Sequence, residues 1–135
     1  MLENKKAWLF PFNCNKYDLL GSLIKNGFVD YGTNLKEISK DDIVYVYSTA
    51  PYSSILFKCI VKDELCIGEN TDDSEFRSKD EKISSKSRYL RLYPIQNYLN
   101  KKELVGYDAL INNGLKVVKS QSKLSPEVIN YLDNI

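Results

Sequence analysis

The stretch from residue 43 to residue 61, "IVYVYSTAPYSSILFKCIV", constrains the fold most, because two apolar runs flank a short polar loop. Every second residue of a β-strand faces the same side, so strands with one wet face alternate apolar and polar residues. The first run is instead apolar on both faces, while the second carries lysines on one face. We expect the second to place Ile55, Phe57, Cys59 and Val61 together. The pattern predicts a β-hairpin that is covered on both faces along much of its length.

An earlier run, "KKAWLFPF", has the same two-sided character. As a strand it places Trp8 and Phe10 on one face and Ala7 and Leu9 on the other. Such a strand fits the inside of a barrel or a position under a helix better than a sheet with one exposed face.

Helix signals follow this strand. Asn15 is a candidate N-cap, and Leu19, Leu20, Leu23 and Ile24 form the expected apolar stripe. A short segment at 28–31 then leads toward the hairpin.

The second half of the chain continues the mixed pattern. "SRYLRLYPI" predicts a strand that Pro94 stops. "YDALINNG" predicts a short helix, "LKVVK" a last short strand, and "SPEVINYLDNI" a helix with Ser125 as its cap. The order of elements predicts a single α+β domain over residues 1–135, with a small β-barrel or curled sheet flanked by short helices.

Composition narrows the class of protein. The chain has 135 residues, of which 43% are hydrophobic and 27% charged, as in ordinary globular domains. No apolar run approaches the roughly 20 residues of a membrane helix, and the N-terminal run is too short for a secretory signal, so we expect a cytoplasmic protein. The formal charge of +1 gives no global field for nucleic acid, so such a partner requires a local patch.

Catalytic and metal sites find little support. The chain has no histidine and only scattered glycines, and its three cysteines have no paired spacing. The paired carboxylates at 41–42 and 72–73 lie in polar segments, where such pairs are usually solvated. We therefore expect a protein that is not an enzyme and that has no cofactor and no metal.

Aromatic residues near short polar ones give a stronger signal. Tyr52 lies in the hairpin loop, Asn13 and Tyr17 follow the first strand, and Tyr31 follows the first helix. If the first strand neighbours the hairpin, these loop ends could meet at one edge of the barrel. Aromatic faces beside hydrogen-bonding groups suit an extruded nucleobase. The same rings could instead merely cap the barrel.

Several motifs together resemble the EVE domain of the PUA-like superfamily, in the form found in modification-dependent restriction proteins. They are "AWLFPFNCNKYDLLGSL", "VDY", "ISKDDIVYVYSTAPYSSILFKCIVKDEL", "SRYLRLYPI", "LINNGLKVV" and "LSPEVINYL". The resemblance covers nearly the whole chain apart from an acidic loop. It implies a small PUA-like barrel that reads a modified, typically methylated, base in DNA by flipping it into an aromatic pocket.

This chain departs from the family pattern in three places. Tyr31 stands where related domains usually have Trp, and Asp41-Asp42 where they usually have Gly-Asp. Near the C-terminus, the family motif usually reads Gln-Gly-Pro, then one variable residue, then Arg. The run 119–123 stands in its place here, and Lys123 replaces the Arg. Lys lacks the planar bidentate geometry that Arg offers to phosphate.

The resemblance and the residue pattern together give a set of candidate site residues. The expected base pocket consists of Asn13, Asn15, Tyr17, Tyr31, Ser48, Thr49 and Tyr52, with Ser53 beside them on the rim. The expected phosphate contacts are Lys16, Lys116, Lys119 and Lys123.

Two other functions stay open. The chain could be a protein–protein adaptor or a phage-encoded inhibitor that uses the acidic loop at 64–81. It could also be an RNA-binding PUA-like domain, since the 2′-hydroxyl lets a protein distinguish RNA from DNA.

Overall fold

The computed structural model describes residues 6–13, 17–49, 52–66, 69, 76, 88–116 and 118–135. The elements in chain order are β1 (Ala7–Phe12), α1 (Leu19–Asn26), β2 (Val29–Thr33), β3 (Ile43–Ser48), β4 (Ser54–Leu65), β5 (Arg88–Asn97), α2 (Lys102–Val105), α3 (Tyr107–Asn112), β6 (Ser122–Lys123) and α4 (Pro126–Asp133).

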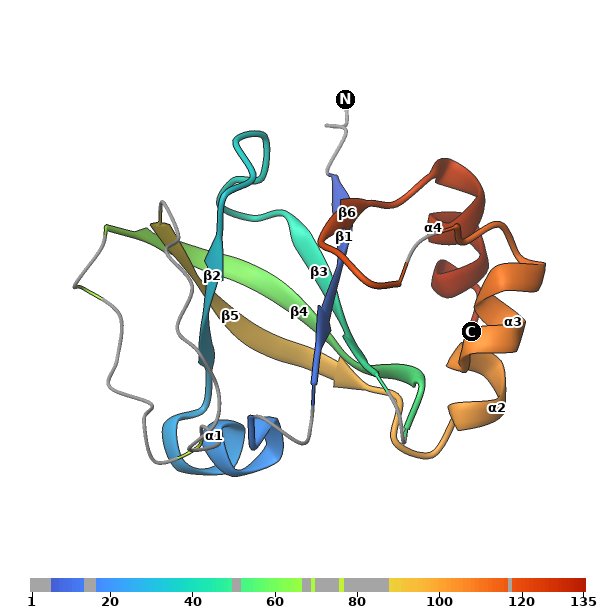
Figure 1. Ribbon diagram of the computed structural model, residues 1–135, viewed down its shortest axis with the longest axis horizontal. Helices are drawn as coiled ribbons and strands as arrows, with labels where there is room; N and C mark the ends of the chain where they lie inside the picture. The colour runs from blue at the N-terminus through green and yellow to red at the C-terminus, as the bar shows by residue number, and fades with distance from the viewer. Residues whose placement is uncertain are drawn as a thin grey trace.

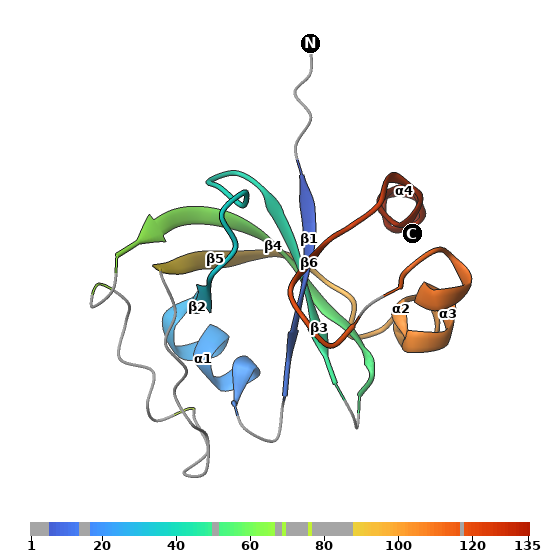
Figure 2. The ribbon, with the colours of Figure 1, turned by 45° about the horizontal axis from the view of Figure 1, so that its top comes forward.

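These strands form one six-stranded sheet in the order β2-β5-β4-β3-β1-β6. β1 runs parallel to β3, and the other neighbouring strands are antiparallel. The sheet curls into a half-barrel, with α1 at one end and α2, α3 and α4 together on one side (Figures 1 and 2). The predicted α+β fold with a curled sheet and short helices is confirmed.

Each face of the sheet carries its own apolar core. The inner core lies within the curl and contains Trp8, Phe10, Leu19, Val29, Ile38, Val44, Val46, Leu56, Phe57, Cys59, Val61, Leu90 and Leu92. The outer core lies between the sheet and α2, α3 and α4, and contains Ala7, Leu9, Tyr45, Tyr47, Ile55, Tyr98, Val105, Leu110, Leu115, Leu124, Val128 and Leu132. This arrangement explains the two-sided strands: both faces of β1 and β3 are buried.

A β-bulge corrects the predicted faces of β4. Val46 is opposite Phe57, whereas Tyr47 is opposite Ile55, so Leu56 is the extra residue. The bulge turns Ile55 to the outer core while Phe57 stays in the inner core. Strict alternation along β4 was therefore the wrong expectation at this point.

The first helix begins later than predicted. Asp18 is the N-cap of α1 and accepts a hydrogen bond from the Gly21 N–H at 2.9 Å, while the expected cap Asn15 lies outside the described residues. The expected stripe is only half buried, because Leu20 is 41% and Ile24 85% exposed. A helix of two turns at the end of the sheet can bury one narrow face only.

Two further predictions about the second half were wrong. The segment at 115–119 contains no strand among its described residues, and β6 forms instead at Ser122–Lys123 along the edge of β1. β5 does not stop at Pro94 but continues to Asn97, with an irregular register where Pro94 lies opposite Cys59. Helix α2 was not predicted. Pairing with a neighbouring strand decided the bounds of β5 and β6, and local sequence does not encode this pairing.

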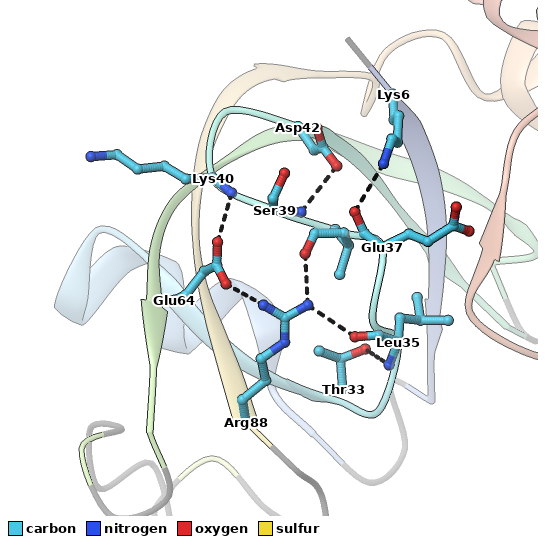
Figure 3. Close-up of polar contacts among 10 residues, drawn as sticks. Lys6, Thr33, Leu35, Glu37, Ser39, Lys40, Asp42, Glu64 and Arg88 are labelled. Carbon is cyan, nitrogen blue, oxygen red and sulfur yellow. Dashed lines mark hydrogen bonds and ion pairs between the residues drawn. The ribbon is translucent and has the colours of Figure 1, made fainter.

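Arg88 makes several polar contacts at one end of the half-barrel (Figure 3). We call this end, which consists of residues 33–42 with Glu64 and Arg88, the closed end. The Arg88 Nη2 donates to the carbonyl oxygens of Leu35 and Ile38 at 2.9 and 2.6 Å. Its Nη1 pairs with Glu64, whose other carboxylate oxygen accepts from the Lys40 N–H at 3.1 Å. The side chains thus fix the connection between β2 and β3.

Asp42 secures the same connection from the inside. This buried carboxylate accepts hydrogen bonds from the Trp8 indole N–H at 3.0 Å and from the Ser39 N–H at 3.1 Å. The preceding Asp41 has φ +76°, in the left-handed region that favours glycine. Asp41 adopts this conformation without a glycine.

Candidate functional site

The opposite end of the half-barrel forms where β1 and β3 finish side by side. Thr49 makes two bonds to the Phe12 carbonyl oxygen, from its N–H at 3.1 Å and its hydroxyl at 3.3 Å. Ser48, opposite Phe12 in the register, is fully buried, and its hydroxyl donates to the Thr49 carbonyl at 3.2 Å. The first strand and the hairpin are therefore neighbours.

Tyr31 joins this end from β2. Its ring packs edge-on against Phe10, with centroids 5.1 Å apart, and its hydroxyl donates to the Pro11 carbonyl oxygen. β1 and β2 are not hydrogen-bonded neighbours in the sheet, so this side chain links two strands across the seam of the half-barrel. The ring is half-buried and keeps part of its surface accessible.

Tyr17 lies at the start of α1 beside the end of β1. Its N–H donates to the Asn13 carbonyl oxygen at 3.1 Å, and its hydroxyl donates to the buried Ser22 hydroxyl at 3.2 Å. Phe76 packs near it, with ring centroids 6.5 Å apart, and the Phe76 carbonyl accepts from the Asp18 N–H at 2.7 Å. Sequence reasoning missed Phe76, because it lies in a polar stretch far away along the chain.

We call this region the open end. It brings together five of the predicted pocket residues: Asn13, Tyr17, Tyr31, Ser48 and Thr49. The hydroxyls of Ser48, Thr49 and Tyr31 donate to backbone carbonyls, and Ser48 is fully buried. The groups that can meet a ligand are therefore the acceptor oxygen of Thr49 and the ring surfaces of Tyr31 and Tyr17. Asn13 is exposed at the rim. Asn15 and Lys16 lie outside the described residues.

Among the described residues, no hydrogen bond or ring contact joins Tyr52 to this group, whereas the N–H of the next residue, Ser53, donates to the Thr49 carbonyl at 3.4 Å. The Tyr52 ring is 44% exposed and lines a separate depression with α2 and α3. Tyr31, by contrast, packs on the inner core. The hairpin loop thus faces the helices on the outer face of the sheet.

The predicted phosphate contacts Lys116, Lys119 and Lys123 are all exposed. Their segment crosses the seam, because Gln121 binds β2: its amide N–H donates to the Gly32 carbonyl at 2.9 Å, and its oxygen accepts from the Thr33 hydroxyl at 2.7 Å. The segment that carries Lys119 and Lys123 therefore runs beside Gly32, the residue that follows Tyr31. Gln121 was not singled out from the sequence, since nothing local marks its bridging role.

The acidic loop at 64–81 is described only in part. Glu64 belongs to the closed end, and Cys66 and Glu69 form a local turn in which the Cys66 N–H donates to the Glu69 carboxylate at 2.7 Å. The acidic residues 72–75 lie outside the described residues.

Cys59 and Tyr45 are titratable groups that are buried in the two cores. Burial raises the pKa of the Cys59 thiol to about 12, and burial with the neighbouring Tyr98 raises the pKa of Tyr45. A thiol held protonated is a poor nucleophile and metal ligand. Within the described ranges, no three His, Cys, Asp or Glu side chains gather as metal ligands, and no helix is long and apolar enough to span a membrane.

Comparison with solved structures gives the class of fold. A single-substitution variant of the ASCH protein of Zymomonas mobilis matches with a TM-score of 0.64 at 11% identity, covering 97% of this chain and 99% of that one. A protein from Pseudomonas putida matches with a TM-score of 0.60 at 11% identity, covering 95% and 97%. One from Agrobacterium tumefaciens gives 0.58 at 10%, covering 96% and 92%.

The chain therefore has an ASCH-like fold of the PUA-like type over nearly its whole length. No protein-family model matches the chain, and no curated protein matches it in sequence. The predicted PUA-like fold is confirmed, while the assignment to EVE domains stays a prediction.

Proposed function

We propose that this protein is a nucleic-acid-binding domain that reads a modified base in DNA, and that the open end receives the base. The PUA-like fold supports this proposal together with the rings that the fold gathers there. The observation that carries it is the position of Tyr31, a half-buried ring at the seam between β1 and β2. Stacking of one base on one aromatic ring contributes roughly 1–3 kcal/mol.

Flipping suits this geometry better than groove reading. A base in a duplex cannot reach a ring that lies in the seam of a barrel, whereas an extruded base can. Thr49 is bonded to the Phe12 carbonyl, and Asn13 is the next residue along the chain, so we propose that these two residues contact the edge of the base. We propose this as a binding function, with any nuclease activity in another domain or subunit of a restriction or defence system.

The lysine segment supplies the electrostatic part of the proposal. Lys119 and Lys123 are exposed on either side of Gln121, which ties their segment to β2. Phosphate contacts there would hold the DNA strand next to the seam and make binding weaken with salt.

Fluorescence anisotropy with two duplexes that differ only in one methylated base tests the reader function. We expect tighter binding of the methylated duplex and loss of this preference in Tyr31→Ala, with circular dichroism confirming the fold. Tyr89→Ala, a half-buried tyrosine near the closed end, is the matched control and should keep the preference. Equal affinity for both duplexes contradicts base reading, and no binding at low salt contradicts the whole proposal.

A second measurement tests the lysines and the type of nucleic acid. Lys119→Gln with Lys123→Gln should reduce the slope of log affinity against log salt by about one for each phosphate-binding lysine that is replaced, and Lys62→Gln on β4 should not. An RNA oligomer of the same sequence runs in parallel. Tighter binding to RNA than to DNA would assign the open end to the RNA-binding class.

A further inference from the structure

A second aromatic surface lies on the other side of the hairpin, and the open end does not use it. This depression has a volume of about 530 Å³ and opens widely to solvent. Its lining comes from the hairpin loop and from α2 and α3: Tyr52, Ser53, Lys102, Glu103, Gly106, Tyr107, Asp108 and Ala109. Its volume falls in the range of about 300–1,000 Å³ that is typical of ligand sites.

Backbone contacts hold the two walls of the depression together. The Tyr107 N–H donates to the Ser53 carbonyl at 2.9 Å, and Gly106 forms a β-bridge with Ser54. A Cβ at Gly106 would lie 3.0 Å from the Lys102 carbonyl oxygen, so a larger residue would crowd the turn between α2 and α3. Ser53 has φ +49°, a conformation that non-glycine residues rarely adopt. The floor is thus fixed by main chain.

The side chains over this floor include two tyrosines, two carboxylates and one lysine. Tyr52 and Tyr107 are 44% and 45% exposed. Glu103 and Asp108 are exposed carboxylates that form no ion pair with any described residue. Lys102 is the cation of the lining, so two carboxylates and one ammonium group leave a formal charge of −1.

This combination selects for the charge of a ligand. Phosphate would meet two carboxylates, so the depression disfavours the DNA backbone. A cation would gain the faces of the tyrosine rings and the carboxylate oxygens together. Among protein cations, a guanidinium fits best, because it stacks flat on a ring while its N–H fork binds a carboxylate.

We propose that the depression binds an arginine side chain of a partner protein. The guanidinium stacks on Tyr107 or Tyr52 and donates to Glu103 and Asp108. The described lining contains no residue of the acidic loop at 64–81.

Nuclear magnetic resonance on the isotope-labelled full chain tests this inference. The probe is N-acetyl-arginine amide, and N-acetyl-citrulline amide is its neutral control of nearly the same shape. We expect the arginine probe to shift the backbone amides of Ser53 and of residues 106–109, and citrulline to bind at least about 5-fold more weakly, as the loss of a cation–π contact and charge pairing implies.

Three variants assign the effect to named groups. Glu103→Gln with Asp108→Asn should weaken arginine binding by about 2- to 5-fold for each charge removed and leave citrulline unchanged. Lys102→Gln should tighten it up to about 2-fold, since it removes a repelling charge. Glu37→Gln, an exposed carboxylate at the closed end, should change nothing.

Equal shifts with both probes, shifts confined to other surfaces, or no shifts at all would overturn the inference. The test is independent of the proposed function. Tyr31→Ala should keep arginine binding, and the Glu103 and Asp108 variant should keep DNA binding, so either proposal can fail alone.

Discussion

The two ends of the half-barrel use polar side chains in different ways. At the closed end, charged side chains bind other groups of the same chain. Arg88 donates to two carbonyl oxygens and pairs with Glu64, and Asp42 accepts from the Trp8 indole N–H. At the open end, the hydroxyls of Ser48, Thr49 and Tyr31 donate to backbone carbonyls, while the rings of Tyr17 and Tyr31 stay partly exposed. The polar side chains of the closed end thus hold its own connection in place, whereas the open end leaves part of its aromatic surface accessible.

We expect the largest change in stability from Asp42→Ala at the closed end. The substitution leaves the buried Trp8 N–H and the Ser39 N–H without an acceptor, and each unsatisfied group costs about 1–3 kcal/mol. We expect urea denaturation to show a loss of about 3 kcal/mol, with nucleic-acid binding unchanged in the folded fraction. Glu37→Ala on the same connection is the control. A loss below about 1 kcal/mol would show that the network does not secure this end.

The free energy of unfolding at alkaline pH should depend on a group in the inner core, the Cys59 thiol, and not on either end. The ordinary pKa of the thiol is 9.0, and that of Cys59 is raised to about 12. The unfolded thiol therefore loses its proton first, so stability is complete below pH 9 and falls between pH 9 and 12, by about 1.4 kcal/mol per pH unit.

Cys59→Ala should make this alkaline fall shallower, whereas Cys66→Ala, at an exposed thiol, should not. The raised pKa of Tyr45 acts in the same direction from about pH 10 upward, so part of the slope should remain. Urea titrations at several pH values measure it. Identical slopes in the wild type and in Cys59→Ala would contradict the assignment.

At the open end, Tyr31→Phe separates the hydroxyl from the ring. Loss of the bond to the Pro11 carbonyl should cost about 1 kcal/mol of unfolding free energy. The ring remains, so we expect the preference for a modified base to survive, unlike in Tyr31→Ala. Tyr89→Phe on β5 is the matched control for stability. A lost preference in Tyr31→Phe would mean that the hydroxyl, rather than ring stacking, reads the base.

The smallest effect is expected from Asp41→Gly, which should stabilise the closed end. Glycine adopts φ +76° without the steric cost of a side chain, although aspartate tolerates this region better than most residues, so the gain should be about 0.5 kcal/mol. The neighbouring Lys40→Gly should lose stability instead. Thermal unfolding of the two variants gives the sign directly. A loss in Asp41→Gly would show that the Asp41 side chain itself supports the turn.

The predicted elements succeeded where burial repeats along one segment. The two-sided strands β1 and β3 were recognisable because Trp8 and Phe10, or Val44 and Val46, recur every second residue. The failures share another cause. The bulge at Leu56 depends on how β4 pairs with β3. Strand β6 depends on pairing with the edge of β1 at Leu9.

The same division holds for the candidate site. The residues near the end of β1 were predicted to meet because the first strand was expected beside the hairpin, and Asn13, Tyr17 and Thr49 do share that end. Tyr52 could not be placed from sequence, because the direction of a hairpin loop depends on what packs against it. Helix α2, which was not predicted, lines the depression beside it.

By itself, the sequence determined the class of the fold and the two-sided burial of its strands, since hydrophobic spacing is a property of one segment. The tertiary structure alone decided the register, the seam closed by Tyr31 and Gln121, and the separation of Tyr52 from Tyr31. These features depend on contacts between residues far apart in the chain, whose free energies appear only once the sheet has curled.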